Sequence, residues 1–410
     1  MKRDYFWNTL GAILQSAISP LLLLVVTRLN GVAAAGVFSF AFAVSLLLWA
    51  LGMWGGRTYQ VSDTRKEFAH QSYIMVRIVL AVIVLTVAAI FCVLNQYDAY
   101  KTGLIFALVI FKLLESFADV LYGILQVHGK LYMSGRSLTA KAVLGFAVFV
   151  GIDMATGNLI LASLGIVLVN ILIFALYDVV RTRQQEEIFF PLATAQKYLA
   201  QARQILWRCA GVFVIFFAAM FSLNIPRYFI DMRSDDEVGY FGIIAMPITL
   251  IVLLISFILQ PNIVRLSELY KKADFAKFKR SVNKILLVSV GIGVGVLLVT
   301  AAYGAQILQL IFGISFVDYY ASLVVIVAGG VASALVTVYL NAFVIMRRIK
   351  FAVIVLTVTN ILLVPLSYFM VRDGGVLGGV WAFTGVNIVQ LMMIAVFFWR
   401  SKRGGVVSAK

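Results

Sequence analysis

Residues 285–303 read ILLVSVGIGVGVLLVTAAY, nineteen consecutive positions without a charged side chain. A helix crosses the hydrocarbon core of a bilayer with roughly 20 apolar residues, so this stretch alone predicts a membrane span. The rest of the chain has the same character, because 62% of its 410 residues are hydrophobic and 13% are charged. Soluble domains have about 25% charged residues. The composition therefore excludes a soluble enzyme and a disordered chain, and predicts an all-α polytopic membrane protein.

The apolar runs divide the chain into about twelve predicted spans. We expect these spans near residues 8–28, 31–54, 74–95, 102–126, 138–156, 158–177, 206–227, 238–260, 284–303, 318–346, 349–371 and 375–399. With this division, 27 of the 34 Lys and Arg residues fall on the side that holds the N-terminus, and 5 fall on the other side. Positively charged loops resist translocation, so the bias predicts that both termini lie in the cytoplasm.

The two halves of the predicted topology are similar in sequence. The sixth span reads VLVNI at 167–171 and the twelfth reads TGVNI at 384–388, which places Asn170 and Asn387 at matching positions. Since each half has six spans, the repeat is a parallel one about an axis along the membrane normal, a type found in transporters. The expected organisation is an N-terminal six-helix lobe at 1–180, a cytoplasmic linker at 181–205, a C-terminal six-helix lobe at 206–400 and a cytoplasmic tail at 401–410.

Motifs of the common membrane-associated enzymes do not occur in the sequence. No Gly-x4-Gly-Lys-Ser/Thr pattern is present, so the chain does not bind ATP through a P-loop. Cys92 and Cys209 are far apart in apolar segments, which predicts neither a disulfide nor a metal site. The loops are too short to form a soluble catalytic domain. We therefore expect no catalytic residues, no metal and no cofactor, and transport is the function that remains.

The fourth predicted span contains three charged residues, Lys112, Glu115 and Asp119. One charge near the bilayer centre costs at least about 2.5–3.5 kcal/mol, so three in one span require a reason. Their spacing places them on one helical face, and Lys112 is close enough to pair with Glu115. Two interpretations stay open. The charges lock this helix to a neighbour, or they line a water-filled cavity in which Glu115 or Asp119 binds a coupling ion, H+ or Na+.

Several basic residues lie at the ends of predicted spans. Arg28 and Arg227 each stand at the external end of the first span of a lobe, where a positive charge is disfavoured, and we expect both to meet an anionic ligand. Arg57 follows Gly55 and Gly56 at the cytoplasmic end of the second span, where it is a candidate phosphate ligand.

Two more basic residues, Arg77 and Lys141, lie one turn inside their spans. We expect both side chains to snorkel to the cytoplasmic interface.

Polar residues form a stripe along the first predicted span. Asn8, Gln15 and Ser19 recur on roughly one face, and Asn224 stands near Pro226 in the seventh span. A polar stripe in a membrane helix faces protein or water rather than lipid. The stripe either packs against another helix or lines a cavity, and we assign these four residues to the cavity lining.

With these features together, the chain resembles the Wzx-type polysaccharide flippases of the multidrug/oligosaccharidyl-lipid/polysaccharide (MOP) exporter superfamily. The resemblance covers nearly the whole chain in length, repeat and topology. Its motifs are QSAISP and VVTR in the first span, GVFSF in the second, GRTYQVSD after the second, and NIPRYFID with EVGYF at the join of the seventh and eighth, at residues 15–20, 25–28, 36–40, 56–63, 224–231 and 237–241.

The resemblance implies a flippase that moves an undecaprenyl-pyrophosphate-linked oligosaccharide from the cytoplasmic to the outer leaflet of the bacterial cytoplasmic membrane. It implies two lobes that alternate access to a central, mainly cationic cavity. Arg28, Arg57, Lys112 and Arg227 are then the candidates for binding the pyrophosphate and glycan. The implied partners are the lipid-linked oligosaccharide, membrane lipids, and glycan polymerases and glycosyltransferases, with no nucleic acid.

Two other functions compete with this one. A multidrug/cation antiporter of the same superfamily has the same fold, but carboxylates would dominate its cavity, whereas this chain places more basic than acidic residues in and beside its spans. The other alternative is a non-transporting membrane component of a glycan-assembly complex. The charges of the fourth span argue against it.

Overall fold

A computed structural model describes residues 2–63 and 67–400, and the predicted tail at 401–410 lies outside these ranges. All regular elements within them are helical. The α-helices are α1 (Lys2–Met53), α2 (Gly56–Ser62), α3 (His70–Leu94), α4 (Ala99–Val127), α5 (Leu131–Thr156), α6 (Leu159–Ile173), α7 (Val180–Arg183), α8 (Ala195–Asp231), α9 (Asp235–Ile244), α10 (Met246–Lys271), α11 (Phe275–Phe312), α12 (Tyr320–Ile345) and α13 (Ile349–Arg400). A π-helical segment, η1 (Phe174–Val179), joins α6 to α7, and a 3-10 turn, η2 (Leu192–Thr194), precedes α8.

Nine helices of the described chain are long and apolar enough to cross a membrane. Two of them, α1 and α13, have 52 residues each, more than twice the number that one span needs. Each is broken by a glycine with positive φ, Gly31 at 84° and Gly375 at 53°. Glycine adopts such values without the steric penalty of a Cβ atom. The breaks fall between the spans that the sequence predicts at 8–28 and 31–54, and at 349–371 and 375–399.

Helix α4 is not one of the nine, although it has 29 residues. Every stretch of 18 residues within it contains at least three charged side chains, because Lys112 and Glu115 are central and either Lys101 or Asp119 is always included. The all-helical prediction is confirmed for the described residues, while the number of twelve spans stays a prediction.

The chain divides into two compact units, and the division falls between Met220 and Phe221, inside α8. We call the residues up to Met220 the N-terminal unit and those from Phe221 the C-terminal unit. The predicted lobe and linker boundaries stay predictions.

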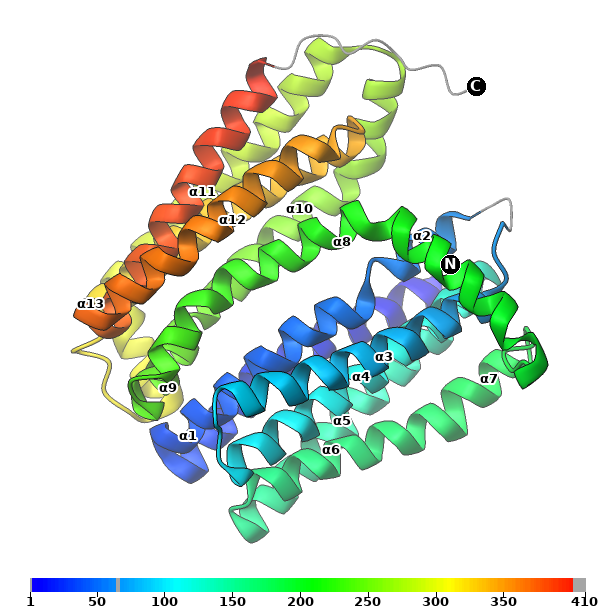
Figure 1. The fold of residues 1–410 in the computed structure, drawn as a ribbon. Coiled ribbons are helices and arrows are strands. Elements are labelled where there is room, and N and C mark those ends of the chain that lie inside the picture. Colours follow the sequence, from blue (N-terminus) through cyan, green and yellow to red (C-terminus); the bar gives the residue numbers. More distant parts are fainter. Residues whose placement is uncertain (1, 64–66, 401–410) are drawn as a thin grey trace. The chain divides into compact units, whose positions relative to one another are not determined.

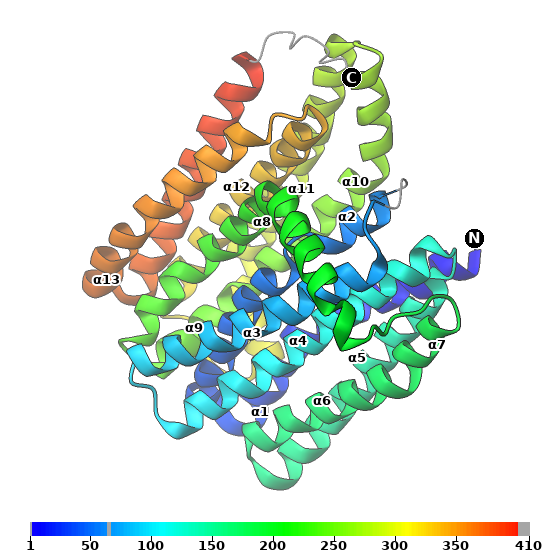
Figure 2. The ribbon, with the colours of Figure 1, turned by 45° about the vertical axis from the view of Figure 1, so that its right-hand side comes forward.

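In the N-terminal unit, α1 packs against α5, α4 and α3, and α6 packs against α5 and α4 (Figures 1 and 2). In the C-terminal unit, α12 lies against α10, α11 and α13 (Figure 1).

Glycines bring α1 and α5 into direct backbone contact. A Cβ atom on Gly11 of α1 would stand 2.7 Å from the carbonyl oxygen of Gly135 in α5, and a Cβ atom on Gly135 would overlap the backbone of Trp7 and Asn8. Small residues allow this close approach in membrane helices. The contact sets the distance between α1 and α5 near Gln15, four residues beyond Gly11, and Lys141, six residues beyond Gly135.

The asparagines of the proposed repeat are in equivalent local environments. Asn170 and Asn387 are each 1% exposed. The Nδ2 of each donates to the carbonyl four residues earlier, at 2.9 Å to Ile166 and 2.8 Å to Phe383.

Candidate functional site

The N-terminal unit encloses a cavity of about 110 Å³ in which charged side chains meet. We call it the polar cavity. Helices α1, α2, α4 and α5 contribute its lining residues, which are Gln15, Trp49, Met53, Arg57, Glu115, Ala118, Asp119, Tyr122, Leu138 and Lys141. Five of these ten residues carry a charge or a phenol, so the cavity is an unusual feature within a unit built of apolar helices.

The first group at the cavity joins α4 to α1. Lys112 Nζ lies 2.8 Å from Glu115 Oε2, and the other carboxylate oxygen of Glu115 accepts a hydrogen bond from Gln15 Nε2. The ammonium of Lys112 also lies 4.6 Å from the ring centroid of Phe111 and 5.2 Å from that of Phe42. Side chains of Lys112 and Glu115 are 7% and 12% exposed. Pairing and ring contacts reduce the free energy cost of holding this lysine in an apolar environment.

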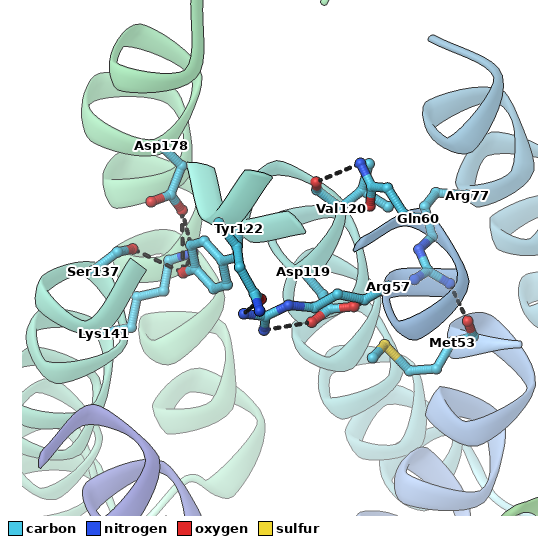
Figure 3. Close-up of polar contacts among 11 residues, drawn as sticks. Met53, Arg57, Gln60, Arg77, Asp119, Val120, Tyr122, Ser137, Lys141 and Asp178 are labelled. Carbon is cyan, nitrogen blue, oxygen red and sulfur yellow. Dashed lines mark hydrogen bonds and ion pairs between the residues drawn. The ribbon is translucent and has the colours of Figure 1, made fainter. Parts of the chain in front are cut away.

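The second group surrounds Asp119, one turn further along α4. Its Oδ1 lies 3.1 Å from Arg57 Nη1, and its Oδ2 lies 3.4 Å from Arg77 Nη2 (Figure 3). Arg57 also donates through Nη2 to Gln126 Oε1 at 3.0 Å. One carboxylate thus lies between two guanidinium groups that come from different helices.

The backbone between α1 and α2 places Arg57 at this point. Trp54 and Gly55 both have positive φ, 42° and 67°, which turns the chain sharply so that α2 starts at Gly56. A Cβ atom on Gly56 would lie 3.1 Å from Arg77 Nη2, so glycine leaves room for that guanidinium. The turn therefore sets Arg57 and Arg77 on the same carboxylate.

Arg77 stabilises the end of α1 as well as Asp119. Its Nη1 donates to the carbonyl of Gly52 at 2.6 Å and to that of Met53. A cation at these last carbonyls of a helix is favoured by their unpaired lone pairs and by the helix dipole. The expectation that Arg77 snorkels is wrong, because its side chain is 1% exposed and has these partners inside the unit.

The third group joins α5, α4 and the π-helical segment η1. Lys141 Nζ lies 2.5 Å from Asp178 Oδ2 and 3.1 Å from the Tyr122 hydroxyl, which also lies 2.9 Å from Ser137 Oγ (Figure 3). The side chains of Lys141 and Asp178 are 4% and 0% exposed. The expectation that Lys141 snorkels is therefore also wrong.

Together these three groups form one polar network, defined as the charged residues that line the cavity or pair with those that do. It has four cations and three carboxylates, Arg57, Arg77, Lys112 and Lys141 against Glu115, Asp119 and Asp178. The network therefore carries one net positive charge in a place with little water. A buried charge without a counter-ion is costly, so such a site favours the entry of an anion.

Four of the residues proposed from sequence line this cavity, Gln15, Arg57, Glu115 and Asp119. Lys112 does not line the cavity but pairs with Glu115, which does.

Three residues of α1 that the sequence assigned to the ligand site or to the cavity lining lie elsewhere. Asn8 is at the close contact of α1 with α5, and Ser19 is half-buried but is not a lining residue. Arg28 is exposed and stands thirteen residues beyond Gln15, roughly 20 Å along a helix.

Asn224 and Arg227 belong to the C-terminal unit, on α8. Asn224 is 6% exposed, and the Arg227 guanidinium carbon lies 5.3 Å from the ring centroid of Phe241.

Sequence reasoning missed Tyr122 and Asp178. Asp178 lies one residue beyond the sixth predicted span, which ends at residue 177. Helical structure instead continues through η1 and α7 to Arg183. A lysine one turn inside the fifth span was the available signal that a buried carboxylate had to be present.

Solved structures of other membrane proteins have the same fold as this chain. The lipid II flippase MurJ in an inward closed conformation superposes with a TM-score of 0.73 over 96% of this chain and 87% of MurJ, at 11% identity. An inward-facing MATE family multidrug transporter of the MOP superfamily gives 0.69 over 94% and 96%, at 14% identity. The chain has the MOP transporter fold. The two structures are of a flippase and of a multidrug transporter. With nine helices of the described residues long and apolar enough to cross a membrane, this chain is a multi-pass membrane protein.

The chain is also similar in sequence to a protein of capsular polysaccharide biosynthesis. The capsular polysaccharide biosynthesis protein CapF of Staphylococcus aureus is 25% identical over 317 residues, which cover 76% of this chain and 78% of CapF. No protein-family model matches the chain. The relative and the MOP fold together fit the resemblance to Wzx-type flippases.

Proposed function

We propose that this protein is a flippase that moves an undecaprenyl-pyrophosphate-linked oligosaccharide from the cytoplasmic to the outer leaflet of the bacterial cytoplasmic membrane. The observation that carries the proposal is the net positive charge of the polar network. The fold of MOP transporters and the similarity to a capsular polysaccharide biosynthesis protein support it. In this proposal both termini are cytoplasmic, and the two units alternate access to the ligand.

Arg57 is the residue best suited to bind the pyrophosphate. Its side chain is 27% exposed, more than that of any other cation of the polar network, and its two terminal nitrogens point to different acceptors. A guanidinium fork matches two oxygens of a phosphate group. The phosphate replaces Gln126 first, because a neutral amide is a weaker acceptor than a dianion.

The size of the cavity restricts what it can hold. A volume of about 110 Å³ is well below the roughly 300–1,000 Å³ of pockets that hold drug-sized ligands. It suits a group of the size of a phosphate rather than an oligosaccharide. The polar cavity is therefore the headgroup site, and the glycan and the polyprenyl chain lie outside it.

Glu115 and Asp119 are the proposed sites for a coupling ion, H+ or Na+. Each already has a cationic partner, Lys112 for Glu115 and two arginines for Asp119. A ligand phosphate that attracts these cations leaves the carboxylates without a counter-ion. Uptake of H+ or Na+ then restores the charge balance.

A drug/cation antiporter remains the second candidate because of the MATE-like fold. A cationic drug needs a carboxylate that is available to it. In the polar network every carboxylate has a cation within 3.5 Å, and one cation is in excess. The charge of the network thus favours an anionic ligand.

The experiment is a leaflet-specific assay with the purified full chain in liposomes. A short-chain polyprenyl-pyrophosphate sugar with a fluorescent label is placed in the membrane, and its exposure to a membrane-impermeant quencher is followed. We expect the wild type to move the lipid at least tenfold faster than empty liposomes, Arg57→Ala to abolish that gain, and Arg57→Lys to restore part of it.

The matched control is Arg136→Ala. Arg136 is an exposed arginine of the same unit that contacts the rings of Trp7 and Tyr132 and does not line the cavity. The Arg136→Ala variant should flip the lipid at the wild-type rate. Transport of an organic cation but not of the pyrophosphate lipid would favour the antiporter, and equal flipping by Arg57→Ala and wild type would remove Arg57 from the ligand site.

A further inference from the structure

The function proposed above assigns no step to the buried pair of Lys141 and Asp178, although both belong to the polar network. Asp178 is 0% exposed, and its Oδ2 accepts from Lys141 Nζ at 2.5 Å. Lys141 is its one ion-pair partner in the described chain. A charged carboxylate in such a place depends on that single cation, because no water is available to solvate it.

Asp178 has a second carboxylate oxygen, Oδ1, that is buried and has no hydrogen-bond partner among the described residues. The side chain lies in η1, a π-helical segment. Such segments are rare in proteins, and those that occur are often at functional sites. An acceptor left unpaired in this way costs free energy and is a position where a proton can be held.

The surroundings of Asp178 provide hydroxyl groups for a proton. The Tyr122 hydroxyl lies 3.5 Å from Asp178 Oδ2 and 2.9 Å from Ser137 Oγ. Both residues are buried, at 3% and 1% exposed. The carboxylate is therefore in contact with one hydroxyl and is linked through it to a second.

Lys141 connects this carboxylate to the ligand site. Both Lys141 and Tyr122 line the polar cavity, while Asp178 lies behind them. Lysine has a flexible four-carbon stem and a compact charge, so its ammonium can move from Asp178 toward a phosphate in the cavity without any change of backbone. The two sites therefore share one cation.

We propose that Asp178 is a proton-binding site linked to anion binding through Lys141. An anion in the polar cavity draws the ammonium of Lys141 away from Asp178, and the carboxylate takes up one proton from solution. Lys141 stays protonated and donates to the anion, and the protonated carboxyl donates to a neighbouring hydroxyl. The inference rests on the proposed function, since it requires the anion site of the polar cavity.

The other charged groups that face this site do not replace Lys141. From α4, Glu115 and Asp119 have their own cationic partners, and the Tyr122 hydroxyl donates to Asp178 Oδ2 at 3.5 Å. Arg57 and Arg77, from α2 and α3, are bound to Asp119. When the ammonium of Lys141 moves away, no other cation can pair with Asp178, so its carboxylate loses its charge by taking up a proton.

Linkage makes the coupling reciprocal. If the anion promotes protonation of Asp178, then protonation of Asp178 promotes anion binding by the same factor. We therefore expect the affinity for an anion to rise as the pH falls, by at most tenfold per pH unit for the one proton taken up. Replacement of Asp178 by Asn imitates the protonated carboxyl and removes this contribution.

The experiment is calorimetric titration of inorganic pyrophosphate into the purified full chain in lipid nanodiscs. Runs at one pH in two buffers of different ionisation enthalpy give the number of protons taken up for each pyrophosphate bound. The wild type should take up as much as one proton more than Asp178→Asn. Pyrophosphate releases or binds its own protons equally in both proteins, so the difference belongs to Asp178.

The matched control is Asp153→Asn. Asp153 is a carboxylate of the same unit, 2% exposed and bonded to Asn30 at 2.9 Å, and it does not line the cavity. It should give the wild-type proton number. Equal proton numbers for wild type and Asp178→Asn would overturn the linkage and leave the anion site intact. If the wild type does not bind pyrophosphate, the headgroup site of the proposed function fails, and the linkage fails with it.

A second measurement avoids variants that fail to fold. Infrared difference spectra of the wild type should show the carbonyl stretch of a newly protonated carboxyl when pyrophosphate is added. Where Asp178→Asn folds, its spectrum should lack that band. A spectrum of the wild type without the band, or the same band in Asp178→Asn, would contradict the proposal.

Discussion

The Lys141–Asp178 pair allows a quantitative test of how this membrane protein holds charges in its interior. With side chains 4% and 0% exposed, neither group is solvated by bulk water where it stands. Breaking a buried pair costs about 3–5 kcal/mol, because the remaining charge loses its only compensation. We expect Lys141→Met and Asp178→Asn each to lower the free energy of unfolding by about that amount.

The double variant distinguishes a lost attraction from a stranded charge. Lys141→Met/Asp178→Asn contains no buried charge at this site and should cost only about 1–3 kcal/mol, mainly for the imperfect hydrogen bonds of the amide. The coupling energy of the cycle is then at least about 3 kcal/mol, the difference between the summed single effects and the double effect. Unfolding by SDS in mixed micelles, followed by tryptophan fluorescence, measures all four proteins.

An exposed pair in the other unit serves as the control. Arg233 Nε lies 3.1 Å from Glu237 Oε2, at i and i+4 of the chain, with side chains 39% and 24% exposed. Its cycle should give a coupling of only about 0.3–0.5 kcal/mol, since water solvates either partner alone. Additive effects at Lys141 and Asp178, with the double variant as unstable as the two singles together, would refute the reasoning about stranded charge.

Three further predictions concern the helices that position the site. Gly135→Ala should lower the free energy of unfolding by about 1–3 kcal/mol, because the added Cβ atom overlaps the α1 backbone. The control is Gly151→Ala on the same helix, where an added Cβ atom meets no atom within 4 Å. In the same SDS titration this control should raise the free energy of unfolding by about 0.5–1 kcal/mol. Gly31→Ala should cost about 1–3 kcal/mol from backbone strain alone, since φ is 84° and space is open around it; an unchanged unfolding curve would contradict this. Asn158→Ala removes the acceptor for the amides of Ile160 and Leu161 and should cost about 1 kcal/mol, with faster hydrogen exchange in the first turn of α6.

The arrangement of charges also explains why the network is stable before a ligand arrives. Asp119 is shared by Arg57 and Arg77, and Arg77 is held by the carbonyls that end α1. These contacts hold two arginines with a single carboxylate and the end of a helix, whose carbonyls carry only a partial negative charge. The partly exposed side chain of Arg57 is the one that a phosphate can reach, while Arg77 remains structural.

The amino-acid sequence by itself determined that the chain lies in a membrane and that it is helical. Both properties follow from local quantities, the length of apolar runs and the absence of charge within them. The glycines that separate spans, Gly31 and Gly375, stand at predicted boundaries for the same reason, since a positive φ is a local property of the residue. The pairing of Lys112 with Glu115 was also predictable, because one helical turn fixes it.

Only the tertiary structure decided which charges share a site. Asp119 has no partner on its own helix, and its two arginines come from α2 and α3 through a turn at Gly55 that spacing along the chain does not reveal. Asp178 pairs with a lysine thirty-seven residues away because a π-helical segment extends the sixth helix beyond its apolar run. Contacts of this kind depend on the register of packed helices, which no single stretch of sequence encodes.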